Sequence, residues 1–236
     1  MKKILTIVLA LAIGMGCNSL LAKGKKTFEG VITYTISLSG DPSITSSMDM
    51  MPASMLTAVF KTRGQRSMMS IMGQKTFVDA KKGVVTSLID MSMLGLGTYC
   101  MDNHYDAVKN NAADQQSNIE FTGETKTICG YTAEKIRLKT PQEGASVELW
   151  VTRDLTIESG LPTMPGLEGM VPLQFDIQSS AAGMGNITIV LTAKEIKEQK
   201  VPNDDLVPPK DCQKTTPEEL QNLLQQFQNL GVEMDE

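Results

Sequence analysis

The stretch that decides the fold runs from Thr122 to Asp154 and reads TGETKTICGYTAEKIRLKTPQEGASVELWVTRD. Apolar residues alternate with polar ones on both sides of a turn at 141–144. The two sets are Ile136 and Leu138 against Lys135, Arg137 and Lys139, then Val147, Leu149 and Val151 against Glu148, Trp150 and Thr152. A period of two is typical of strands with one buried face. Two such runs around a turn predict neighbouring antiparallel strands.

The same alternation recurs along most of the chain. It predicts further strands at 31–38, 55–61, 65–72, 75–80, 84–90, 98–101, 173–178 and 187–193. Glycine-containing turns separate several of them, for example Thr62-Arg63-Gly64. The polar stretch 102–118 predicts a loop or a short helix. We expect nine to eleven short strands and one or two helices, which is a mainly β (α+β) fold.

The C-terminal stretch predicts the best helix. Thr216 is a candidate N-cap, Pro217 fits the first helical position, and Glu219 completes a capping box. One apolar stripe follows at helical spacing, formed by Leu220, Leu223, Leu224, Phe227 and Leu230. The opposite face is rich in Gln and Asn, so the helix is expected to dock by its leucines.

The N-terminus predicts export. Lys2 and Lys3 precede an apolar run at 4–15 that is too short for a typical membrane span. A signal peptide at 1–22 ends after Ala22 by one interpretation. By the other, Gly16-Cys17 forms a lipoprotein box, Cys17 is lipidated, and the acyl chains are the only link to a membrane.

Charge argues against some partners. The 236-residue chain has a net charge of −5, and loss of Lys2 and Lys3 lowers it to −7. A negative protein is a poor ligand for nucleic acid or for an anionic membrane surface. Three cysteines, Cys100, Cys129 and Cys212, lie beyond the export segment. In an oxidising compartment one pair bridges and one cysteine stays free. Among three pairings we favour Cys129 with Cys212, because each ends a predicted element.

Catalytic signatures are missing from the sequence. His104 is the only histidine, and no glycine-rich phosphate loop joins a strand to a helix. We therefore expect no enzyme activity, no cofactor and no metal site. A weaker alternative is Cu(I) held by thioethers, because methionines cluster, as at Met68, Met69 and Met72. Methionine is also an adaptable filler of apolar grooves.

Six motifs occur in a characteristic order: FEGVITY (28–34), RGQRSM (63–68), VDAKKGVV (78–85), TGETKTICGY (122–131), LWVTRD (149–154) and VPNDDLVPPK (201–210). This order resembles an uncharacterised family of secreted bacterial domains grouped with the lipoprotein-carrier (LolA-like) superfamily. The resemblance covers 28–212 and leaves 213–236 as a helical extension. The family usually closes on an aromatic residue after glycine, where this chain has Asp211-Cys212.

The resemblance implies a strongly curved antiparallel sheet, a half-barrel, whose concave face is covered by helices or loops. Superfamily members bind acyl chains or hydrophobic ligands there. We therefore expect a non-enzymatic binding module for a lipid or other hydrophobic small molecule. The alternative is a structural or protein-interaction domain of the cell envelope, with a self-filled cavity and a protein partner.

Candidate groove or lid residues come from three places. The apolar, proline-rich stretch 161–172 and the C-terminal helix are candidate covers for the concave face. Trp150 either lines the groove or caps an exposed sheet edge. The candidates are Trp150, Met164, Leu167, Met170, Leu223 and Phe227.

Overall fold

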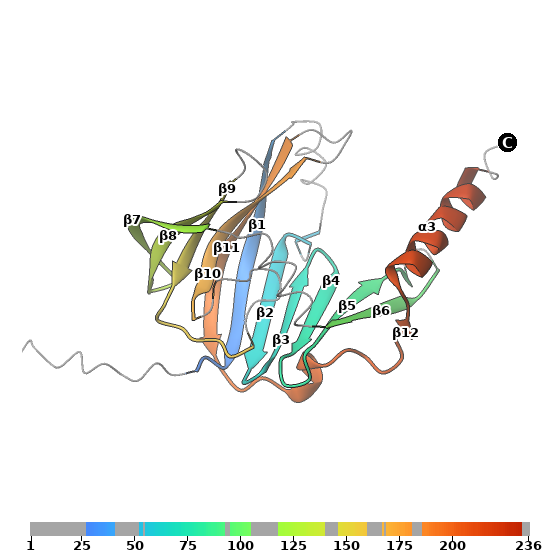
Figure 1. Cartoon of the computed structure of the whole chain (residues 1–236), viewed down its shortest axis with the longest axis horizontal. Helices are drawn as coiled ribbons and strands as arrows, with labels where there is room; N and C mark the ends of the chain where they lie inside the picture. The colour runs from blue at the N-terminus through green and yellow to red at the C-terminus, as the bar shows by residue number, and fades with distance from the viewer. Residues whose placement is uncertain are drawn as a thin grey trace, which may run out of the picture.

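A single curved sheet dominates the molecule (Figure 1). The computed structural model describes residues 27–40, 52–53, 55–92, 95–104, 118–139, 146–159, 167, 169–180 and 186–232. The export segment with Cys17, the Met164 position and most of the polar stretch after His104 lie outside these residues.

Within that part of the chain, twelve strands form the sheet. They are β1 (Gly30–Gly40), β2 (Thr57–Arg63), β3 (Arg66–Ile71), β4 (Gln74–Asp79), β5 (Val84–Asp90), β6 (Thr98–His104), β7 (Asn118–Ile128), β8 (Tyr131–Lys139), β9 (Ser146–Thr152), β10 (Val171–Ser180), β11 (Asn186–Glu198) and β12 (Gln213–Lys214). A 3-10 turn, η2 (Asn203–Leu206), and one helix, α3 (Pro217–Val232), complete the described elements. The fold is thus more nearly all-β than the α+β class we expected.

The strand order across the sheet is β12-β6-β5-β4-β3-β2-β1-β11-β10-β9-β8-β7. Most neighbours follow one another in sequence as antiparallel meanders, which need only short turns. Two neighbours are distant in sequence: β1 beside β11, and β6 beside β12, which run parallel. The sheet does not close on itself, so β7 and β12 are its edges (Figure 1).

One cross-strand row shows how alternation builds the core. Across five adjacent strands, the register aligns Ile36, Leu191, Phe175, Leu149 and Ile136. All five are buried. Full burial of such a side chain stabilises the fold by roughly 1.5–3 kcal/mol. We call this side of the sheet the core face, and the predicted pairing of the two runs around 141–144 is confirmed.

The adjacent row has the opposite character. Thr35, Thr192, Gln174, Trp150 and Lys135 align across the same five strands. Because successive residues of a strand point to opposite sides, this row lies on the other side of the sheet, which we call the opposite face. The period-two pattern therefore separates an apolar face from a polar one in this half of the sheet.

The connection from β9 to β10 covers part of the core face. Leu155 and Leu167 from this connection are buried in the main apolar cluster with Phe28. Ser159 Oγ lies 3.3 Å from Thr62 Oγ1, and both side chains are buried. The connection therefore serves as the predicted loop cover.

A C-terminal strap, residues 201–212, covers the opposite face of the other half. Val201 and Leu206 pack there in a second cluster with Met68, Phe77, Leu88 and Cys100. The strap ends in a disulfide between Cys100 and Cys212. Our expected pairing of Cys129 with Cys212 is wrong. Cys129 is a free cysteine in the turn between β7 and β8, at the far side of the sheet from β6.

Helix α3 begins as predicted. Glu219 N donates to Thr216 Oγ1 at 3.2 Å, and Thr216 N donates to Glu219 Oε2 at 2.9 Å, which is a reciprocal capping box. Figure 1 shows the helix running away from the sheet, so it does not cover the core face as we expected. Among the described residues, no helix is long and apolar enough to cross a membrane.

Strand β6 is longer than predicted. Asp102 to His104 continue it by pairing with Thr86, Val85 and Val84 of β5. His104 is therefore an exposed strand residue and not a loop residue. The polar side chains of this segment led us to predict a loop. Pairing with β5 instead imposes an extended conformation on it.

Candidate ligand-binding site

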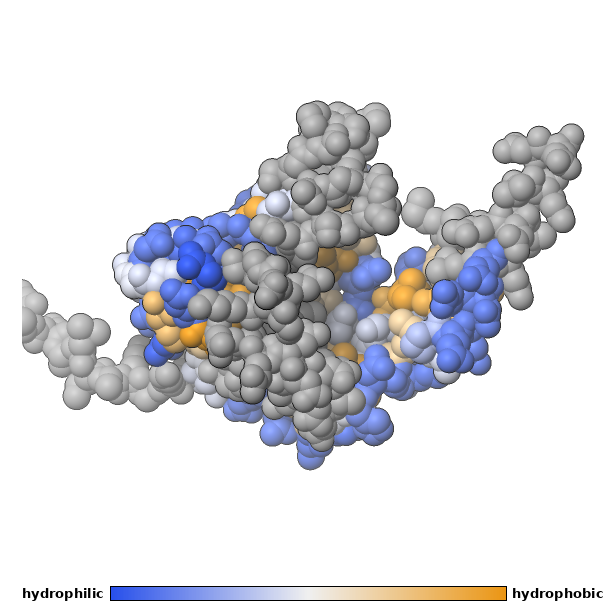
Figure 2. All heavy atoms as spheres, turned by 45° about the horizontal axis from the view of Figure 1, so that its top comes forward, coloured by the Kyte–Doolittle hydropathy of each residue, from blue (hydrophilic) through white to orange (hydrophobic). Residues whose placement is uncertain are grey.

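The sheet encloses a hollow lined by hydrophobic side chains. Figure 2 shows these side chains gathered between the two ends of the curved sheet. A set of partly buried residues packs against the main cluster and extends its apolar surface beyond the fully covered centre. This set includes Met69, Ile71, Met72, Ile119, Leu138, Val147, Met170, Ile189 and Ile196. The hollow is therefore the candidate site for an apolar ligand.

Two of the predicted lid residues come together at this site. Leu167 is buried, and Met170 N donates a hydrogen bond to Leu167 O at 3.0 Å. Met170 is half-buried and packs against the main cluster. Because Leu167 is enclosed and Met170 is not, only Met170 has surface left to contact a ligand without movement of the connection.

Trp150 neither lines the hollow nor caps an exposed sheet edge, the two positions that we considered. The register places it in the polar row of the opposite face, two strands inside the β7 edge, where its half-buried side chain packs against the main cluster from that face. Lys126 Nζ lies 4.0 Å from the ring centroid and donates to Gln174 Oε1 at 2.7 Å. Partial burial lowers the pKa of Lys126 below its usual range. Trp150 thus forms a cation–π contact and does not line the hollow.

The two helix candidates lie apart from the lid. Leu223 is half-buried in α3, and Phe227 belongs to the same helix. Because α3 runs away from the sheet, the structure does not bring these positions to Leu167 and Met170 (Figure 1). Sequence periodicity identified the helix correctly, but it carried no information about where the helix lies.

The buried polar side chains in the described part of the chain are neutral hydroxyls, namely Thr62, Ser67, Thr86, Thr152 and Ser159. Tyr34 adds a buried phenol that donates to Pro172 O at 2.9 Å, and burial raises its pKa. Ser67 Oγ has no hydrogen-bond partner among the described residues. Its strand partner Thr62 places Ser67 on the core face, where the side chain is fully buried, so this hydroxyl is an unsatisfied donor inside the core and is not within reach of a ligand.

The methionine cluster does not form one metal site. Met68 and Met69 are consecutive in β3, so they point to opposite sides of the sheet. Met68 packs in the second cluster under the strap, whereas Met69 packs against the main cluster. Met68 and Met69 therefore do not hold one Cu(I) ion together, and the described residues give the Cu(I) alternative no support.

Comparison with known proteins places the chain in a family without an assigned function. Residues 28–212 match the family described as "Domain of unknown function (DUF4412)". This match confirms the resemblance to an uncharacterised family. No curated protein matches the sequence.

Similar folds occur among solved structures. PNGF-II, solved in two crystal forms, is 14% identical, with TM-scores of 0.49 and 0.50 over 84% of this chain. The chain spans only about a third of PNGF-II, 33% and 34% of its length in the two forms. A LolA superfamily protein from Nitrosomonas europaea is 10% identical, with a TM-score of 0.33 over 77% of this chain and 91% of that protein. At 14% identity and a TM-score of 0.50, the likeness to the second crystal form of PNGF-II concerns the fold alone.

Proposed function

The chain belongs to the DUF4412 family, and we propose that it is a non-enzymatic extracytoplasmic module that binds a lipid, an acyl chain or another apolar ligand on its core face. The observation that carries this proposal is the continuous apolar row from Ile36 to Ile136 on a sheet that stays open. The row itself is buried beneath the covering connection, so a ligand would contact the partly buried apolar residues that pack around it. Figure 2 shows hydrophobic side chains beside a recess between the two ends of the sheet.

The chemistry of the lining supports an apolar ligand. Partly buried methionine and isoleucine side chains surround the covered centre, and methionine adapts its shape to varied apolar groups. Binding sites for small molecules are typically concave and mostly apolar, with a few polar groups that set orientation.

Export is supported by two independent features. The first is the basic and apolar N-terminal segment, which matches a signal sequence. The second is the disulfide between Cys100 and Cys212, because disulfides persist in oxidising compartments and are rare in the cytosol.

Native mass spectrometry of freshly purified protein, followed by titration with a fluorescent fatty acid, tests the proposal. We expect either a co-purified lipid mass or saturable uptake. Ile71→Gln places a polar group among the partly buried core-face residues and should weaken uptake by about fivefold, the equivalent of roughly 1 kcal/mol. Ser70→Gln, one residue earlier in β3 and on the opposite face, is the matched control and should leave uptake unchanged.

A second candidate function is an interaction domain of the cell envelope whose hollow is filled by its own chain. The burial of Leu155 and Leu167 favours it, because these side chains already cover the centre of the core face. A clean mass without lipid, together with no fatty-acid uptake by the unmodified protein, would contradict lipid binding and leave this second function.

A further inference from the structure

The β7 edge carries a second pocket whose lining is charged. This edge pocket has a volume of about 320 Å³ and is lined by Phe121, Gly123, Glu124, Thr125, Glu134, Lys135 and Arg153. It exists because the β7–β8 register shifts: Phe121 faces Ile136 and Thr125 faces Glu134, so three residues of β7 stand opposite Lys135 alone. The resulting bulge bends the strand away from its neighbour.

The side chain of Thr122, which lies within the bulge, holds the bulge in place. Thr122 Oγ1 donates to Lys135 O at 3.2 Å and accepts a hydrogen bond from Glu124 N at 3.3 Å. Gly123 has a φ of 81°, a conformation that glycine adopts without strain. No neighbouring atom lies within 4 Å of the position that a Gly123 Cβ would take. The shape of the pocket is therefore set by the backbone of the β7 bulge.

An exposed aromatic ring forms the apolar part of the lining. Phe121 is 48% exposed, and the Arg153 guanidinium carbon lies 4.8 Å from its ring centroid. Arg153 Nε is 3.5 Å from Glu134 Oε2, and their side chains are 50% and 44% exposed. Charge-assisted hydrogen bonds are usually about 2.7–2.9 Å long, so this ion pair is loose. A solvated pair of this kind costs little to exchange for a ligand.

Lys135 and Glu124 add one positive and one negative charge to the lining of the edge pocket. Lys135 Nζ lies 3.4 Å from Glu124 Oε1 and 3.0 Å from Glu148 Oε2. Glu124 is mostly exposed, with 58% of its side chain open to solvent. The pocket thus presents two cations, two carboxylates and one ring, so an ion of either sign alone would meet repulsion as well as attraction.

We propose that the edge pocket binds a small zwitterion with an apolar part. The anionic group of the ligand pairs with Arg153, its ammonium group pairs with Glu134 and Glu124, and its apolar part lies on the Phe121 ring. Two sources share this chemistry: a free hydrophobic amino acid, and a phosphoethanolamine headgroup of a lipid. The inference is independent of lipid binding on the core face, because none of the seven lining residues belongs to the partly buried set there.

Amide NMR of the full chain provides the test, with the Gly123 resonance as the reporter. L-phenylalanine and dihexanoyl phosphatidylethanolamine, used as a monomer, are the zwitterionic probes, and 3-phenylpropionate and phenethylamine are the matched probes with one charge each. We expect saturable shifts of Gly123 with at least one zwitterion, and weaker binding of both single-charge probes. Arg153→Gln and Glu134→Gln should each weaken zwitterion binding by about fivefold.

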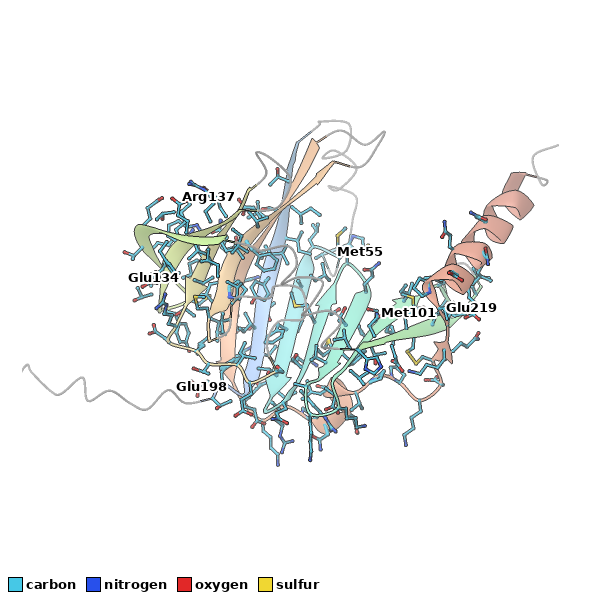
Figure 3. All side chains as sticks on the ribbon, in the orientation of Figure 1. Met55, Met101, Glu134, Arg137, Glu198 and Glu219 are labelled. Carbon is cyan, nitrogen blue, oxygen red and sulfur yellow. A yellow bond between two sulfur atoms is a disulfide. The ribbon has the colours of Figure 1, made fainter. Side chains whose placement is uncertain are left out.

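Arg137→Gln is the matched control. Arg137 belongs to the same strand as Glu134, pairs with Glu148 Oε1 at 3.1 Å and does not line the pocket. Figure 3 labels both residues on β8. Dispersed amide spectra show that each variant is folded. Binding of phenylalanine alone identifies a free amino acid, and binding of the short-chain phosphatidylethanolamine alone identifies a lipid headgroup. An unshifted Gly123, or single-charge probes that bind as tightly as the zwitterions, would overturn the proposal.

Discussion

Tyr34 Oη donates a 2.9 Å hydrogen bond to the backbone carbonyl oxygen of Pro172, on the second strand from its own across β11. Both residues are buried. The register of β10 against β9 shifts just after Pro172, so the phenol satisfies a carbonyl at an irregular point of the ladder. The Tyr34 ring also packs edge-on against Phe175, with centroids 5.9 Å apart. This contact ties β1 to β10 across β11 within the main cluster.

Tyr34→Phe keeps the ring and removes the donor. We expect the free energy of unfolding to fall by about 1–2 kcal/mol, because the buried Pro172 carbonyl loses its partner. Urea unfolding at neutral pH measures this loss. An unchanged free energy would show that the carbonyl finds another donor.

Alkaline pH provides a separate test of the same phenol. Burial raises the pKa of Tyr34 above its usual value of about 10. The unfolded phenol therefore ionises first, so its contribution to stability is complete below about pH 10 and is lost as pH rises further. In Tyr34→Phe the decline of stability between about pH 9 and 11 should be shallower. Equal slopes for the two proteins would contradict the buried, neutral phenol.

The disulfide should account for the redox sensitivity of the fold. Cys212→Ser removes the link between the strap and β6, which spans 112 residues of sequence. A disulfide of this kind typically stabilises a protein by about 2–4 kcal/mol. Chemical unfolding with and without reductant should therefore differ for the unmodified protein and coincide for Cys212→Ser. Cys129→Ser is the control and should keep the difference, because Cys129 is unpaired.

Adjacent residues of β9 should respond differently to truncation. Leu149→Ala opens a cavity in the core row and should cost about 2–5 kcal/mol. Glu148→Ala removes only partly exposed ion pairs with Lys135 and Arg137 and should cost about 1 kcal/mol or less. Similar losses in the two variants would contradict the assignment of the faces.

Asp102 should titrate below the usual range for a carboxyl group. Hydrogen bonds from Lys214 Nζ at 2.6 Å and from Thr86 Oγ1 at 2.6 Å lower its pKa. A lowered pKa means that the contribution to stability is present above the ordinary Asp pKa of about 4 and is lost as pH falls. Lys214→Met should raise the pKa of Asp102, as measured by carboxyl NMR. A midpoint that does not move would show that Lys214 does not hold the carboxylate.

Several features follow from local patterns alone. The alternation around 135–139 and 147–151 predicted which side chains are buried, and Ile136 does pair with Leu149. The period of two determines the face of each residue in the regular parts of a strand, whichever strand becomes its neighbour. The capping box at Thr216 and Glu219 formed for a similar reason, because both hydrogen bonds lie within one turn of helix.

What the sequence by itself determined is therefore local: strand faces, turns and one capped helix. Only the tertiary structure decided which distant segments meet. The parallel pairing of β12 with β6 brings Cys212 to Cys100, and the position of α3 keeps Leu223 and Phe227 away from the Leu167 connection. The physical reason is that every strand offers the same backbone N–H and C=O groups, so backbone hydrogen bonding alone does not select one strand over another as a neighbour. Neighbours far apart in sequence are selected by the packing of the whole sheet, which no single stretch encodes.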